Sequence, residues 1–97
     1  MFAVVRDTTY APNLRLQESE AFQKFQAVHA DQPGYRGSMV VALGEGRHVT
    51  VTLWAQEADM RAAREAIGPT VGRLLNPIMT VEARLIGTGR VVFDDLT

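Results

Sequence analysis

The sequence contains no cysteine, one lysine and only two histidines among its 97 residues. Without cysteine there is no disulfide and no thiolate metal site, and two histidines without a nearby acidic cluster do not predict a structural zinc. No apolar run approaches the roughly 20 residues that a membrane helix needs. The first residues, Met1–Arg6, are too short for a signal peptide and lack a basic leader. We therefore expect a cytoplasmic protein without a metal site.

The charges of the chain nearly cancel, with 10 basic and 11 acidic residues and a formal net charge of −1. The basic residues are scattered from Arg6 to Arg90 and form no cluster. Nucleic-acid binding requires a basic surface that neutralises phosphates. The composition therefore argues against nucleic acid as the main partner.

The apolar content is 46%, which is typical of a globular protein. A chain of this length predicts one domain over residues 1–97. A domain of this size buries only about 60–65% of the surface that its unfolded chain exposes. No disulfide adds to its stability, so association of copies is the natural way to bury more surface.

Hydrophobic periodicity predicts the order strand, helix, strand, strand, helix, strand. We expect strands at residues 1–6, 35–43, 48–54 and 79–86, and helices at 14–30, 55–67 and, briefly, 70–76. Pro33-Gly34 and Gly68-Pro69 are predicted to end the two long helices, and Gly44–Arg47 to form a hairpin turn. This order is that of the α+β, ferredoxin-like βαββαβ fold with an antiparallel sheet.

In this arrangement the helices cover only one face of the sheet, and the other face must find a partner. We expect Val40, Ala42 and Trp54 to lie on that helix-free face. A monomer rarely keeps an exposed apolar patch of this kind. The sequence therefore predicts a homodimer with two-fold symmetry that is formed through the helix-free face.

Two segments resemble a known family. Pro33-Gly34-Tyr35-Arg36-Gly37-Ser38 resembles the P-G-[FY]-x-G strand entry of antibiotic-biosynthesis-monooxygenase (ABM) domains. Val51-Thr52-Leu53-Trp54-Ala55-Gln56-Glu57-Ala58 is similar to their L-W-x-S-x-E-A signature. With the order of elements, the resemblance spans nearly the whole chain and implies a dimeric α+β barrel. Members of this superfamily include cofactor-independent quinone-forming oxygenases, haem-degrading oxygenases and signal-processing enzymes, so the resemblance implies the fold before the activity.

The residues for haem chemistry are missing. Haem-degrading members use an Asn on the first strand, a second Trp in the middle of the second helix, and a His further along the chain. The corresponding positions here are occupied by Val5 or Arg6, by Ala63, and by a residue near Arg73. We therefore expect no haem binding, and no cofactor.

His29 is the candidate catalytic residue, because it shares a helical stripe with Phe22 and Phe25 and should point toward the sheet. A buried neutral His can transfer a proton or donate a hydrogen bond to a carbonyl. The alternative is that His29 caps the carbonyl groups at the end of the helix. A pocket between this helix and the sheet would be lined by the candidate substrate-binding residues Phe22, Phe25, Trp54, Met60 and Leu74. Trp54 either stacks on a planar ligand or fills the corner between strand and helix.

Other polar residues have less specific interpretations. Arg84 and Glu82 share one face of the last strand and predict a salt bridge across the dimer interface, which Arg6 and Asp7 can join. His48 follows a turn and is expected in solvent. Three further residues either donate hydrogen bonds to a polar ligand or serve as turn and cap residues: Tyr10, Tyr35 and Asn76.

The sequence leaves three functions open. The first is a cofactor-independent monooxygenase that acts on a small aromatic substrate. The others are a non-enzymatic barrel that binds a small apolar or aromatic ligand, and a purely structural dimeric barrel. A cavity of a few hundred Å³ beside His29 is required by the enzyme hypothesis, whereas a solid core there contradicts it.

Overall fold

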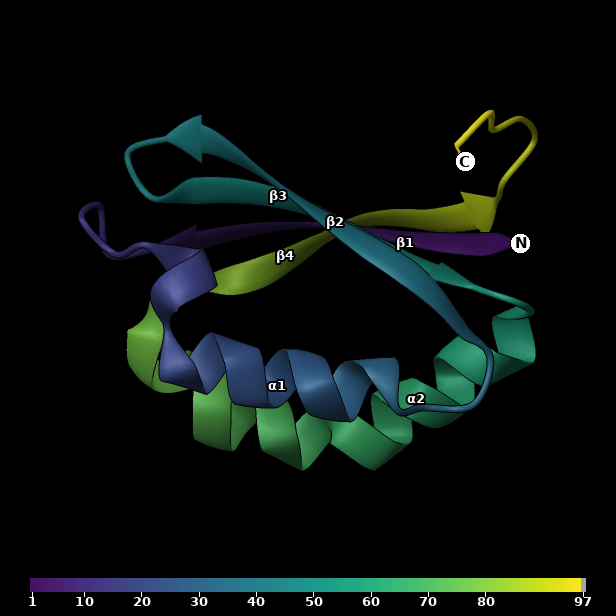
Figure 1. Cartoon of the computed structure of the whole chain (residues 1–97), viewed down its shortest axis with the longest axis horizontal. Coiled ribbons are helices and arrows are strands. Elements are labelled where there is room, and N and C mark those ends of the chain that lie inside the picture. The colour runs from purple at the N-terminus through teal and green to yellow at the C-terminus, as the bar shows by residue number, and fades with distance from the viewer. Residues whose placement is uncertain (97) are drawn as a thin grey trace.

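The two long helices lie against one face of a four-stranded sheet (Figure 1). The computed structural model describes residues 1–96, and at position 82 it describes the backbone without the side chain. The strand order is β2-β3-β1-β4 and every neighbouring pair is antiparallel, which confirms the ferredoxin-like α+β fold. The elements are β1 (Phe2–Tyr10), α1 (Glu20–Ala30), β2 (Tyr35–Gly44), β3 (Arg47–Trp54), α2 (Glu57–Thr70) and β4 (Met79–Arg90). Within residues 1–96, no helix is long and apolar enough to cross a bilayer.

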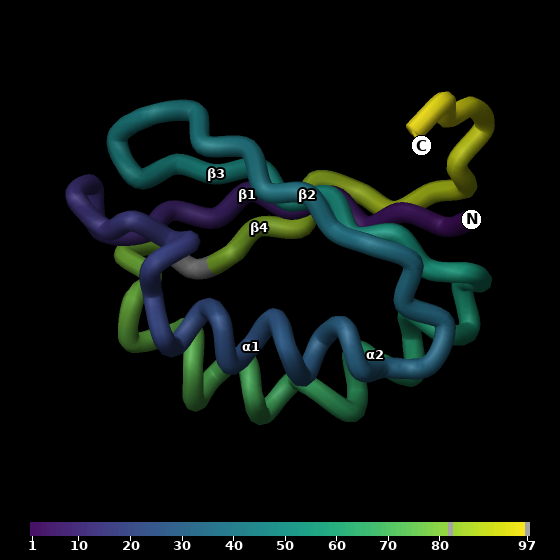
Figure 2. Tube along the Cα trace, viewed as in Figure 1, coloured from purple at the N-terminus to yellow at the C-terminus, as the bar shows by residue number. Residues whose placement is uncertain are grey.

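The two ends of the described chain lie close together. Strands β1 and β4 pair along their length, and the backbone N–H of Val91 donates to the carbonyl oxygen of Met1 at 2.9 Å. After Arg90 the chain turns away on the side of the sheet opposite the helices (Figure 2). The predicted end of the last strand at residue 86 is wrong, because β4 runs through to Arg90 and absorbs its irregularities as register shifts against β1.

Helix α1 begins later than the sequence pattern predicts. A short 3-10 turn, Leu16–Glu18, comes first, and Ser19 is the N-cap residue. The Ser19 hydroxyl accepts a hydrogen bond from the backbone N–H of Phe22 at 3.2 Å. Serine is favoured at this position because its oxygen satisfies an N–H that has no partner within the helix. The predicted start near residue 14 is therefore wrong, because α1 begins at Glu20.

Strand β1 extends beyond Arg6 to Tyr10. The segment Asp7–Thr9 has little apolar character, but β3 and β4 pair with it on both sides. A central strand is stabilised by these pairings more than by its own propensity. The predicted loop after Arg6 is wrong, and the extension places Thr8 and Tyr10, both buried, on the face under the helices.

Helix α2 does not stop at Gly68-Pro69 as predicted. Pro69 lies inside its last turn, and the chain continues as a π-helical turn, Val71–Leu75, and a 3-10 turn, Asn76–Ile78. A proline removes one backbone hydrogen bond from a helix, and π-helical turns are found frequently at functional sites. Here the widened turn directs Val71 and Leu75 toward the space between the helices and the sheet.

The two family-like segments meet in space. Tyr35 and Trp54 are direct partners across β2 and β3, and their rings pack edge to face with centroids 5.7 Å apart. The carbonyl oxygen of Gly34 accepts from the backbone N–H of Ala55 at 2.7 Å. Gly34 has a φ of +81°, and a Cβ there would overlap the carboxylate of Asp59. Both motifs are therefore structural, since they fasten the loop before β2 to the start of α2.

The sheet faces are the reverse of those predicted. Trp54 is buried with Val4, Met60 and Ala63 beneath the helices. Because side chains alternate along a strand, Val40 and Ala42 lie on that helix-covered face too. The open face carries their neighbours instead, of which these are exposed: Met39, Val41 and Leu43. Strand β2 is apolar on both faces, so its pattern does not say which face the helices cover. In β3 the uniformly apolar face, with Val49, Val51 and Leu53, is the open one, whereas Thr50, Thr52 and Trp54 lie under the helices.

We predict that Trp54→Ala lowers the free energy of unfolding by about 3–5 kcal/mol, the usual cost of deleting a large buried aromatic side chain. Trp54 is 2% exposed and packs against Tyr35 and His29. Urea unfolding measures the loss, and Trp54→Phe, which keeps a ring, should lose less. An alanine variant as stable as the parent would show that this packing does not hold the fold together.

Candidate functional site

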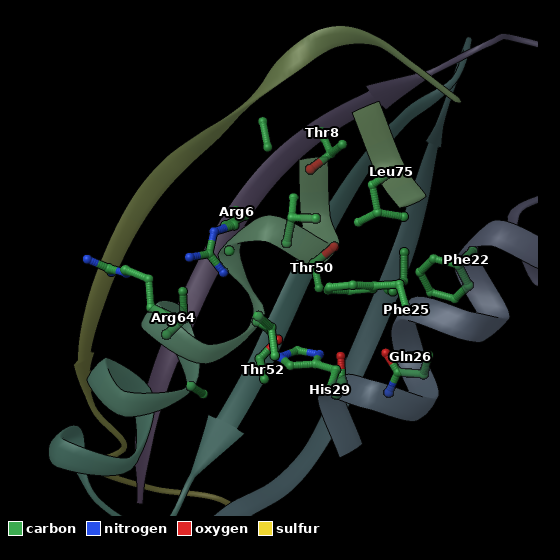
Figure 3. Close-up of a pocket in the computed structure, with 18 of the residues that line it drawn as sticks. Arg6, Thr8, Phe22, Phe25, Gln26, His29, Thr50, Thr52, Arg64 and Leu75 are labelled. Carbon is green, nitrogen blue, oxygen red and sulfur yellow. The ribbon is translucent and has the colours of Figure 1, made fainter. Parts of the chain in front are cut away.

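A cavity of about 280 Å³ lies between the two helices and the sheet (Figure 3). Five of the six residues proposed from the sequence line it: Phe22, Phe25, His29, Trp54 and Met60. Leu74 does not, and Leu75 takes its place. The prediction treated residues 70–76 as a separate regular helix, whereas the π-helical turn changes which leucine faces inward. Of the lining residues, only Arg64 and Gly68 are exposed, which marks the second half of α2 as the rim.

His29 lies within a group of aromatic rings. Its ring stacks on Phe25 at a centroid distance of 5.1 Å, and it meets Tyr35 and Trp54 edge-on at 5.3 and 5.5 Å. Positions 25 and 29 are one helical turn apart on α1, so their side chains fall on the same face. The interpretation of His29 as a helix-end cap is wrong, because its side chain is 6% exposed and points into the protein.

The Nδ1 atom of His29 is buried and has no hydrogen-bond partner among the described residues. A buried polar atom without a partner costs about 1–3 kcal/mol, and such atoms are rare in folded proteins. Burial, and after it the positive charge of Arg6, lowers the pKa of His29 to about 4. The imidazole is therefore neutral at physiological pH and has an unused hydrogen-bonding atom.

The low pKa of His29 distinguishes between two possible roles, transfer of a proton and donation or acceptance of a hydrogen bond. Transfer of a proton from a phenol with a pKa near 10 to a base with a pKa of about 4 is unfavourable by about 8 kcal/mol. A neutral imidazole has one nitrogen that donates and one that accepts a hydrogen bond. The site therefore favours His29 as a hydrogen-bond partner for a ligand oxygen over His29 as a general base.

The sheet side of the cavity is mixed, with apolar side chains such as Val4 and Val40 between polar ones. Five hydroxyl side chains line it: Thr8, Tyr10, Ser38, Thr50 and Thr52. Arg6, at the middle of β1, also projects into this space and is half-buried (Figure 3). Burial and the nearby charge of Arg64 lower the pKa of the Arg6 guanidinium. The cavity thus has a largely apolar lining, with the hydroxyl groups and the Arg6 guanidinium on its sheet side.

The predicted network on β1 and β4 exists in part. Asp7 lies on the open face and accepts hydrogen bonds from Arg47, with Nη2 to Oδ2 at 3.0 Å, while Arg84 approaches the same oxygen at 3.6 Å. Arg84 thus has a partner within its own chain. Arg6 points to the opposite side of the sheet and does not join this network, and the Glu82 side chain lies outside the described part of the structure.

Among the remaining polar candidates, Tyr10 lines the cavity, whereas His48, Tyr35 and Asn76 do not. His48 is buried, not solvated as predicted: its Nδ1 lies 2.8 Å from the carbonyl oxygen of Gly46, and its ring packs edge-on against Tyr10. The Tyr35 hydroxyl accepts a hydrogen bond from Gln26 Nε2 at 2.8 Å. Asn76 starts the 3-10 turn before β4 and does not line the cavity.

Comparison with known proteins identifies the fold. No family model and no curated protein sequence matches the chain. Among solved structures, a variant of SnoaB, a cofactor-independent oxygenase from Streptomyces nogalater, matches with a TM-score of 0.68 and 19% identity over 96% of this chain and 97% of its own. An antibiotic biosynthesis monooxygenase matches with a TM-score of 0.69 and 12% identity over 95% and 99%.

A third structure, Rv0793 from Mycobacterium tuberculosis, matches with a TM-score of 0.72 and 10% identity over 98% of both chains. These identities are low, so the matches establish architecture and not chemistry. The chain therefore has the fold of ABM-like α+β barrel domains, and the fold resemblance recognised in its two motifs is confirmed.

We predict that His29 makes stability depend on pH. The folded pKa of about 4 lies below the value near 6.5 expected in the unfolded chain. Between these values the unfolded chain binds a proton that the folded chain does not, so the free energy of unfolding falls as the pH falls. The loss attributable to His29 totals about 3 kcal/mol by the low end of this range.

Urea unfolding of the parent and of His29→Phe from pH 7 to pH 4 measures the effect. The parent should lose stability more steeply than the variant as the pH falls toward 4. Parallel profiles would show that the histidine titrates normally.

Proposed function

We propose that this protein is a cofactor-independent monooxygenase that oxidises a small hydroxylated aromatic molecule in the cavity under the helices. The observation that carries this proposal is the cavity itself, which places the neutral His29, with its partnerless Nδ1, beside the ring of Trp54. Its volume is close to the lower end of the range of about 300–1,000 Å³ typical of ligand pockets. The fold shared with SnoaB, a cofactor-independent oxygenase, supports the same class of reaction.

The proposed reaction converts a hydroxyarene and dioxygen into a quinone and water, and the substrate supplies all four electrons. The phenol loses its proton to solvent and transfers one electron to dioxygen, and the resulting radicals combine to form a carbon–oxygen bond at the para carbon. Cleavage of the O–O bond then turns that carbon into a carbonyl, while hydroxide leaves with the hydrogen of the same carbon. The proton released at the start converts hydroxide to water.

The protein's contribution is to position and desolvate the ring. Phe25 and Trp54 provide aromatic surfaces for a planar substrate, and the imidazole of His29, which lines the cavity, provides a hydrogen bond to one of its oxygens. The sheet hydroxyls satisfy the remaining polar groups. The same cavity also suits the alternative of a non-enzymatic ligand-binding barrel, whereas a purely structural barrel would need a filled core.

We predict that the parent consumes dioxygen with a phenolic substrate whose para carbon carries hydrogen, and that His29→Phe lowers the turnover rate at least about tenfold, the loss expected when one hydrogen bond to the reacting group is removed. An oxygen electrode with a panel of dihydroxynaphthalenes and anthrones measures the rate. His48→Phe is the matched control, because His48 is the other buried histidine and does not line the cavity.

The outcomes distinguish the three functions. Binding of panel members without oxygen uptake would replace the enzyme with a ligand-binding protein. If the protein neither binds panel members nor takes up oxygen with them, the result would favour a purely structural barrel. Equal turnover by the parent and by His29→Phe would remove His29 from the reaction.

We further propose that a second copy of the chain covers the open face of the sheet. This face carries the exposed side chains of Met39, Val41 and Leu43 in β2, next to the half-buried Val49 and Val51 of β3. Apolar patches of this kind usually mark interfaces, and a two-fold dimer would bring the same patch of each copy together. The cytoplasmic location and the single domain over residues 1–97 likewise remain predictions from the sequence.

We predict that the parent has about twice the monomer mass in light scattering at micromolar concentration. Val41→Asp, which places a charge on the open face, should shift the mass to that of a monomer because a buried unpaired charge is costly. Val28→Asp on the outer surface of α1 is the matched control and should remain dimeric. A monomeric parent, or a Val41→Asp variant that stays dimeric, would contradict this interface.

A further inference from the structure

We propose that the cavity selects an anionic aromatic ligand, and that Arg6 binds its acidic oxygen, either a phenolate or a carboxylate. This inference rests on the proposed function in one respect only, namely that the ligand occupies the cavity under the helices. It goes further because it assigns a charge to the ligand and a specificity-determining role to a residue of β1.

The first observation is the position of Arg6. It pairs with Thr50 in β3 and Leu85 in β4, so it lies in an interior strand of the sheet, and its side chain projects into the cavity (Figure 3). None of the described ion pairs includes Arg6. The neighbouring carboxylate of Asp7 points to the other face and binds Arg47. A half-buried guanidinium in an apolar cavity is costly unless an anion accompanies it.

The second observation is a second cation on the same cavity. Arg64 of α2 lines its rim, where Nη2 contacts the sulfur of Met60 at 3.7 Å. The two guanidiniums are close enough that the charge of Arg64 contributes to lowering the pKa of Arg6. Two like charges beside one space create a positive potential that attracts anions. A guanidinium also matches a carboxylate geometrically, because its N–H groups form two parallel hydrogen bonds.

The third observation is the distribution of polar groups around the cavity. The hydroxyls of Thr8 and Thr50 lie on the floor near Arg6, whereas the walls at Phe22 and Phe25 are aromatic (Figure 3). His29, which is neutral, contributes a separate hydrogen-bonding atom. The geometry fits a planar ring with an acidic oxygen toward Arg6 and a second oxygen toward His29.

A charge link between the two residues follows. The positive charge of Arg6 is one cause of the lowered pKa of His29. An anion bound to Arg6 would offset that charge, so ligand binding should raise the pKa of His29. A neutral ligand of the same shape would leave this charge in place.

Two probes of nearly the same shape test the proposal: 2-naphthoate, which is anionic, and 2-naphthamide, which is neutral. Trp54 is the only tryptophan and lines the cavity, so its fluorescence reports binding. The parent should bind 2-naphthoate at least about tenfold more tightly than 2-naphthamide, the preference that one charge-assisted hydrogen-bonded pair provides.

Arg6→Gln should abolish this preference while 2-naphthamide still binds. Arg6→Lys, which keeps the charge but loses the planar fork, should retain a weaker preference. Arg36→Gln removes an exposed arginine outside the cavity and should behave as the parent does. In the parent, the His29 imidazole resonances should show a higher pKa with 2-naphthoate than with 2-naphthamide.

Equal affinity of the parent for both probes would overturn the proposal. So would an Arg6→Gln variant that prefers 2-naphthoate over 2-naphthamide as strongly as the parent does. If Arg6→Gln does not fold, two results together would overturn the proposal: Arg6→Lys prefers 2-naphthoate as strongly as the parent does, and the pKa of His29 in the parent is the same with both probes.

A different result would contradict the proposed oxidation alone. Selective binding of 2-naphthoate without any oxygen uptake with the panel of hydroxyarenes would leave the anion site intact and contradict the monooxygenase reaction.

Discussion

The packing of Tyr35 against Trp54 is the interaction on which the rest of the structure depends. It joins the start of β2 to the end of β3, and Gly34 beside it allows the preceding loop to contact Asp59 at the start of α2. Both helices are thereby fixed at this end of the sheet. Farther along, the sheet presents short hydroxyl side chains such as Thr50, which are too small to fill the space below the helices. The cavity is the result.

The same arrangement determines the chemistry of the site. A histidine enclosed by three aromatic rings and near a guanidinium stays neutral, and its Nδ1 has no partner among the described residues. A half-buried Arg6 and a partnerless His29 both cost stability. Proteins accept such local costs mainly where they serve function. Both free-energy penalties would be offset by a ligand that places an anionic oxygen beside Arg6 and a hydrogen-bonding group beside His29.

The fold and the helix side of the cavity could be predicted from the sequence, because the two motifs and the helical stripe of Phe22, Phe25 and His29 are strong local patterns. The failures arose where tertiary contacts override local patterns. Pairing on both sides extended β1 through a polar segment, and the π-helical turn replaced Leu74 with Leu75. The helix-covered face could not be assigned from the pattern, because β2 is apolar on both faces and the face of β3 with threonines is the one under the helices. As a result, the sequence pattern gave no indication that Arg6 faces the cavity, since that depends on knowing which face is covered.

A crystal structure of the protein with 2-naphthoate would test directly whether the cavity binds an anionic aromatic ligand. We expect the naphthalene ring in the cavity beside Phe25 and Trp54, with the carboxylate within hydrogen-bonding distance of Arg6. A cavity that contains only water while the ligand lies on the open face of the sheet would contradict it. So would a cavity that is closed by side chains in the crystal, because every functional inference above requires that the space beside His29 be open to a ligand.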